Sequence, residues 1–73
     1  MDSKKLQHLL GEAGVPEELY NLHEAGRDDE RFCLCKKGEQ WQVYFLERGV
    51  KTIDKVFNME TEACQYIYEQ LID

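Results

Sequence analysis

Glycines in the middle of the sequence set the length of its most regular segments. Between residues 31 and 57 the side chains alternate between apolar and polar in three stretches, with breaks around Gly38 and around Gly49. Alternation with a period of two predicts strands, and a glycine supplies the positive φ that a tight hairpin turn requires. Connections this short join neighbouring strands, so the segment predicts an antiparallel meander.

One face of the predicted sheet is strongly apolar. Trp41, Val43 and Phe45 share this face, and the preceding strand places Phe32 and Leu34 together on one side. An apolar sheet face needs a second layer to cover it. We therefore expect helices to pack over Trp41, Val43 and Phe45, with Trp41 buried between the two layers.

Amphipathic helices are predicted at both ends of the sequence. Apolar residues recur at helical spacing in residues 3–13 and again in residues 60–72. Asp2 or Ser3 can cap the start of the first helix, and Gly14 is placed to end it in the left-handed conformation. The two helices supply the layer that the sheet requires.

The segment after the first helix has two interpretations. A helical turn at residues 16–19 is expected, followed by a short edge strand at residues 20–24, although Leu19 and Leu22 would also suit a helix.

The fold class that these predicted helices and strands indicate is α+β. We expect a two-layer sandwich in which a three- or four-stranded antiparallel meander lies between N- and C-terminal helices, in the order α-β-β-β-α with or without the edge strand. A chain of 73 residues holds one core, so residues 1–73 are predicted to form a single domain.

The charge balance favours some partners over others. Nine Lys and Arg against fifteen Asp and Glu give a net charge of −6, which repels phosphate backbones and disfavours nucleic-acid binding. A basic protein partner fits this charge. The charge can equally serve only to keep a small protein soluble.

The sequence predicts a cytoplasmic protein. Polar residues interrupt any apolar run near the N-terminus, and no stretch approaches the roughly 20 apolar residues of a membrane span. Three cysteines, Cys33, Cys35 and Cys64, are an odd number, and the first two are spaced awkwardly for bridging each other. Reduced thiols and no membrane association are the expectation.

No pattern of catalytic or cofactor-binding residues is apparent. The cysteines and two histidines lack the spacing of a zinc site, and the scattered glycines do not form a phosphate-binding loop. Cys64 could act as a nucleophile with a histidine base, but it falls on the apolar stripe of the last helix, where a small core residue is expected. We expect no cofactor, no metal and no enzymatic activity.

Five stretches of the sequence together resemble a known group of proteins. "YNL", "DERFCL", "GEQWQVYFLERGVK", "KVF" and "TEACQYIYEQL" resemble successive motifs of the small immunity proteins of bacterial polymorphic and contact-dependent toxin systems, over about residues 14–71. The residues that carry the resemblance are Trp41, Glu47, Arg48, Gly49, Phe57, Glu62, Ala63, Cys64 and Tyr66. The group tends to have Ser or Thr at the position of Met59. Asn58 could cap the last helix instead and start it one residue earlier.

The resemblance implies a binding protein that neutralises a cognate bacterial toxin by occluding a basic or catalytic surface, for example of a nuclease. We expect it to act as a monomer or weak dimer. The alternative is a small cytosolic or phage-derived adaptor with no toxin partner. The expected partner-binding residues are Asp28, Asp29, Glu30, Tyr44, Glu47 and Arg48. For Arg48 a structural role is the other possibility, either binding helix carbonyls or pairing with Glu62.

Overall fold

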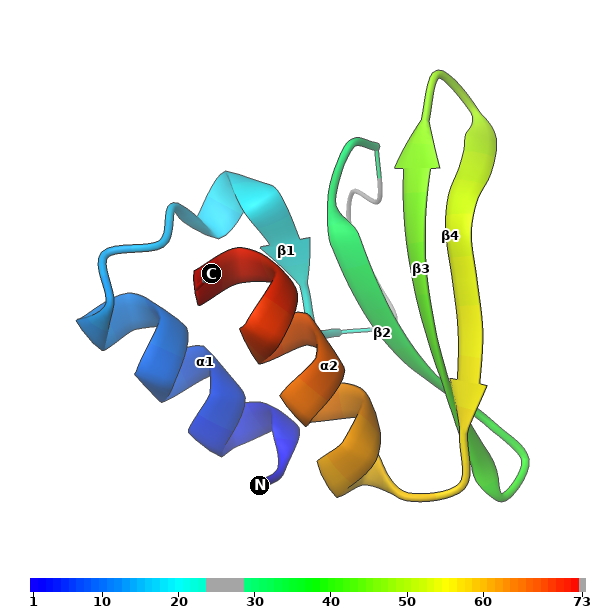
Figure 1. Cartoon of the computed structure of the whole chain (residues 1–73), viewed down its shortest axis with the longest axis horizontal. Coiled ribbons are helices and arrows are strands. Elements are labelled where there is room, and N and C mark those ends of the chain that lie inside the picture. The colour runs from blue at the N-terminus through cyan, green and yellow to red at the C-terminus, as the bar shows by residue number, and fades with distance from the viewer. Residues whose placement is uncertain (24–28, 73) are drawn as a thin grey trace.

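Two helices form one layer of the molecule and a four-stranded sheet forms the other (Figure 1). The structure is a computed structural model and describes residues 1–23 and 29–72. In chain order its elements are α1 (Ser3–Glu12), the 3₁₀ turn η1 (Glu17–Leu19), β1 (Tyr20–Asn21), β2 (Phe32–Lys37), β3 (Gln40–Glu47), β4 (Val50–Phe57) and α2 (Glu60–Ile72). The predicted α+β class, the short edge strand and the two terminal helices are confirmed.

The sheet has the order β1-β2-β3-β4, and its strands are not all antiparallel. The pairs β2–β3 and β3–β4 are antiparallel, as the meander predicts. The expectation of an entirely antiparallel sheet is wrong for β1, which pairs with β2 in parallel, Tyr20 lying opposite Phe32. β2 therefore starts at the same end of the sheet as β1 and runs in the same direction. The connection is too long for the tight turn that a hairpin uses.

Both antiparallel pairs close with two-residue turns. Gly38 has φ 61° at the first turn position between β2 and β3. Between β3 and β4, Glu47 pairs with Val50, and the two residues enclosed, Arg48 and Gly49, have φ 54° and 80°. Two consecutive left-handed residues define a type I′ turn, whose twist matches that of the flanking strands. Glu-Arg-Gly is therefore the end of a strand followed by a hairpin turn.

The observed ends of the helices match those predicted from the sequence, except at the start of α2. The Lys5 amide donates to Asp2 Oδ1 at 2.8 Å at the start of α1, and Gly14 has φ 77° after its end. The Ala63 amide donates to the Met59 carbonyl oxygen, so α2 starts at Glu60 and not one residue earlier. The suggested cap is wrong, because Met59 and not Asn58 precedes the first helical residue, and the Asn58 side chain instead accepts a hydrogen bond from Gln40 Nε2 at 3.0 Å.

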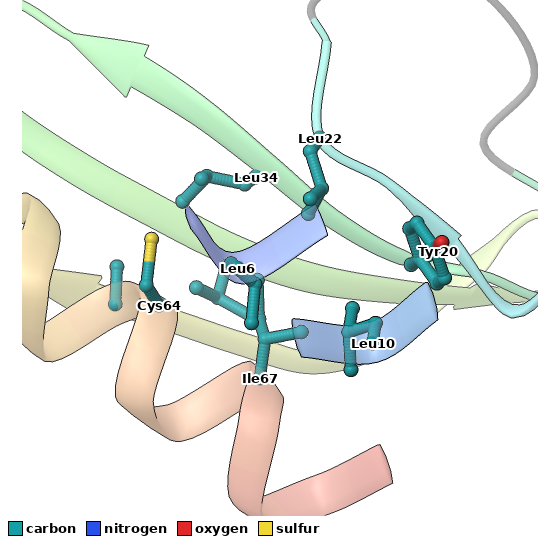
Figure 2. Packing of buried hydrophobic residues seen from close by; sticks show 9 residues of the cluster. Leu6, Leu10, Tyr20, Leu22, Leu34, Cys64 and Ile67 are labelled. Atoms are coloured by element: carbon teal, nitrogen blue, oxygen red, sulfur yellow. The ribbon is translucent and has the colours of Figure 1, made fainter. Parts of the chain in front are cut away.

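The core lies between the helices and the sheet (Figure 2). Leu6 and Leu10 of α1 and Ile67 of α2 are fully buried against the sheet residues Leu34 and Val43. The buried cluster as a whole contains Leu6, Leu10, Tyr20, Leu22, Leu34, Val43, Ala63, Cys64 and Ile67. The apolar stripe predicted for each helix is thus largely its buried face, but Ala13, the last residue of the first predicted helix, is exposed and follows α1.

The helices cover only part of the apolar sheet face. Val43 has no exposed surface, but Trp41 is half-buried at the margin of the core, where we expected full burial. Phe45 is half-buried and packs its ring against Phe32 at 5.1 Å, outside the helix-covered cluster. The β3–β4 hairpin extends past the helical layer, as Figure 1 shows. Each strand of eight residues spans roughly 26 Å, whereas the 13 residues of α2 span roughly 20 Å.

Candidate protein-binding surface

Acidic residues gather at the end of the sheet that carries the β3–β4 turn, which we call the distal end. The Glu30 amide donates to the Leu46 carbonyl oxygen at 2.7 Å, and Asp29 forms an isolated bridge with Leu46. This backbone contact holds Asp29 and Glu30, which precede β2, beside the last residues of β3. Glu47 is the next residue along β3, so the sheet brings together acids that are 17 positions apart in the sequence.

A depression opens at the distal end on the face that the helices occupy elsewhere. Its described lining residues are Glu30, Phe45 and Glu47, and its volume is about 330 Å³. Phe45 and Glu47 both line it from β3, where the register of the β3–β4 pairing shifts between Phe45 and Leu46. The Phe32 ring lies against Phe45 with an interplanar angle of 59°. The depression is therefore an aromatic surface flanked by two carboxylates.

Within the described part of the chain, no cationic side chain pairs with the carboxylates at the distal end. Asp29, Glu30 and Glu47 are exposed, and none forms an ion pair with a cation in residues 1–23 or 29–72. Exposed, unpaired carboxylates remain hydrated and are available to a partner. They contribute little to the stability of the fold itself.

Left-handed backbone is concentrated in the same region. Glu30 and Arg48 both have φ 54°, and they are the non-glycine residues with positive φ in the described chain. This conformation costs about 1–2 kcal/mol for a residue with a β-carbon.

Arg48 occupies the hairpin turn, and Figure 1 places that turn at the opposite end of the hairpin from the start of α2. It therefore does not pair with Glu62, the structural role considered for it.

Tyr44 belongs to a different surface. Its cross-strand neighbours are Cys33 and Asp54, on the face of the sheet opposite Phe45, and Lys51 Nζ lies 4.8 Å from the centre of its ring. The structure thus brings Asp29, Glu30, Glu47 and the turn with Arg48 to one end but does not place Tyr44 in the depression. Asp28, the remaining expected site residue, lies outside the described residues.

Phe45 is the site residue that sequence reasoning missed. Its alternation with Val43 and Trp41 indicated a position beneath the helices, and alternation carries no information on where the covering layer ends. The lengths of the elements could have indicated this boundary. A helix of 13 residues spans fewer ångströms than a strand of eight residues, so it cannot cover the strand from end to end.

The thiols have the properties of structural cysteines. Cys33, Cys35 and Cys64 do not form disulfides, and Cys64 is fully buried. Burial, reinforced by the charge of Glu60, raises the pKa of the Cys64 thiol to about 11. The thiol is therefore protonated at neutral pH, which disfavours it as a nucleophile. Within the described ranges no three His, Cys, Asp or Glu side chains converge as a metal site would require.

Comparison with known protein families, with curated proteins and with solved structures found no match to this chain. The helices in the described part of the chain are too short and too polar to cross a membrane.

Proposed function

We propose that this chain is a non-enzymatic binding protein that neutralises a cognate bacterial toxin by covering a basic or catalytic surface. The observation that carries the proposal is the placement of Asp29 and Glu30 beside Glu47 through the backbone contact to Leu46. Two acidic segments that are separate in sequence thereby form one continuous surface. Opposite charge on the partner gives this surface its specificity.

Electrostatics supports a role in association more than in final affinity. The net charge of −6 and the exposed distal carboxylates attract a basic protein over distances comparable to the Debye length. Such steering raises the association rate, whereas closely packed contacts set the rate of dissociation. Screening at physiological ionic strength limits its range to roughly 8 Å.

The identity of the partner as a toxin comes from the motif resemblance around Trp41, Glu47 and Gly49. It does not come from the charge. The location of the gene can separate the two candidate classes. A position directly downstream of a gene for a large secreted toxin supports neutralisation, and an isolated gene supports an adaptor without a toxin.

The test uses the toxin domain encoded by the adjacent gene. The triple variant Asp29→Asn, Glu30→Gln and Glu47→Gln should associate with it several-fold more slowly than the parent at low salt, and the difference should shrink as salt is added. Surface plasmon resonance or stopped-flow fluorescence can separate the association and dissociation rates.

A matched variant controls for total charge. Glu12→Gln, Glu39→Gln and Glu62→Gln neutralise three exposed acids at the end of α1, in the β2–β3 turn and in the first turn of α2, all away from the distal end, and change the net charge equally (Figure 1). The control should slow association less than the distal triple variant. Equal rates for the two variants would refute a specific role of the distal end.

A further inference from the structure

The depression between Glu30 and Glu47 is suited to one side chain of a partner. We propose that it receives an arginine of the bound protein, with the guanidinium stacked over the Phe45 ring; this rests on the proposed function, in which the distal end contacts a basic surface. A volume of about 330 Å³ is at the small end of the range for ligand sites, and the depression is open to solvent. An inserted side chain suits these dimensions better than a free small molecule does.

The aromatic surface is held in place before any partner binds. Phe45 belongs to the central strand β3, whose backbone pairs on both sides, with β2 and with β4. The tilted contact with Phe32 at 5.1 Å supports the ring from one side. Because Phe45 lies outside the helix-covered core and is only half-buried, part of its surface can meet a ligand. A cation placed over an aromatic face is attracted by the ring quadrupole.

The carboxylates beside the ring supply hydrogen-bond acceptors and negative charge for the guanidinium. Glu30 and Glu47 come from separate segments and line the same depression, and neither pairs with a described cation. A guanidinium is planar, can stack on a ring and can donate several hydrogen bonds from its edge at the same time. An ammonium is a compact and strongly hydrated charge that lacks the planar stacking surface. The combination of ring and two flanking acids therefore favours arginine over lysine.

Two arginines of the chain itself, Arg31 and Arg48, adjoin these acids in sequence. Neither forms an ion pair with Glu30 or Glu47 within the described residues. Arg48 is exposed in the hairpin turn, where it can meet an acid on the partner. The distal end thus presents charges of both signs at fixed positions, which constrains the orientation of a bound protein.

The experiment is a titration of the isotope-labelled protein with the peptide acetyl-Gly-Arg-Gly-amide at low ionic strength, followed by NMR. Peptides with lysine or neutral citrulline in place of arginine serve as matched ligands. We expect the arginine peptide to shift the amide signals of Glu30, Phe45 and Glu47 and to bind more tightly than either of the other peptides. Equal binding by lysine, or shifts spread evenly over all acidic surfaces, would overturn the proposal.

Variants assign the effect to the depression. Phe45→Leu and Glu47→Gln should each weaken arginine binding by about two- to fivefold, whereas Glu39→Gln in the β2–β3 turn, at the other end of β3, should leave it nearly unchanged. The same spectra report whether each variant is folded. If Phe45→Leu disturbs the fold, Glu47→Gln still decides the outcome, and unchanged binding by that variant contradicts the proposal.

The inference and the proposed function can fail separately. Arginine binding in the depression with no effect of the distal triple variant on toxin association would contradict the proposed function alone. Dependence of toxin association on the distal acids, without peptide binding over Phe45, would contradict the arginine site alone.

Discussion

Replacing Arg48 by asparagine should make the protein more stable. Arg48 is the first of two left-handed residues in the β3–β4 turn, with φ 54°. The left-handed conformation costs about 1–2 kcal/mol for most residues, and asparagine adopts it more readily because its short side chain can hydrogen-bond locally. Asn-Gly is also a favoured pair for a type I′ turn. We expect a gain of about 0.5–1 kcal/mol in the free energy of unfolding.

Urea denaturation at 25 °C measures this change, with the fluorescence of Trp41 as the signal. Trp41 is the single tryptophan and is half-buried at the margin of the core, so unfolding changes its environment. The midpoint should rise while the slope with denaturant stays the same. The thermal midpoint should rise by about 2–8 °C, given about 4–8 °C per kcal/mol for a domain of this size.

Two further variants isolate the backbone contribution. Arg48→Gln removes the same charge but keeps an ordinary side chain in the left-handed position, so it should leave stability nearly unchanged. Gly49→Ala should lower stability by about 1–2 kcal/mol, because φ is 80° there and a residue with a β-carbon is strained in this conformation. A β-carbon at this position would meet no heavy atom within 4 Å, so no steric clash adds to the backbone cost. If Arg48→Asn stabilises no more than Arg48→Gln, the backbone argument is wrong.

Three other results are expected. Ile67→Ala should destabilise the protein by about 2–5 kcal/mol in the same urea assay, because the Ile67 side chain has no exposed surface, and a loss below 1 kcal/mol would contradict its place in the core. Stability should fall by about 2–3 kcal/mol as pH rises from 9 through 11, because the folded state raises the pKa of Cys64 from 9.0 to about 11 and so resists formation of the thiolate. Cys64→Ala should reduce this alkaline loss. A thiol reagent at neutral pH should label half-buried Cys35 faster than buried Cys64, and reductant should leave the thermal midpoint unchanged.

Local patterns were sufficient to predict most of the fold. The period of the leucines predicted α1, and the positions of Gly38 and Gly49 predicted both hairpins, because these features depend on residues close in sequence. The parallel pairing of β1 could not be predicted in this way. A strand of two residues has almost no periodicity, and its direction depends on the path of the whole connection.

The site was predictable only in part, for a similar reason. Glu30 and Glu47 were both expected to contact a partner, but their proximity depends on the hydrogen bond from the Glu30 amide to the Leu46 carbonyl oxygen, a contact between distant segments. The role of Phe45 depends on where the helical layer ends. That boundary is a property of the packed tertiary structure, whereas alternation reports only which face of a strand a residue occupies.

The packing of α1 against α2 has a consequence for synthesis of the protein. The first helix shares its buried cluster with residues of the last, and the Met1 ammonium donates to Thr61 Oγ1, 60 positions away. A nascent chain that ends at Phe57 contains every strand but lacks Ala63, Cys64 and Ile67, so Leu34 and Val43 have only α1 to cover them. The core should therefore close only after α2 has left the ribosome. Until then the unfinished chain exposes apolar strands, and chaperone binding or aggregation competes with folding in that interval.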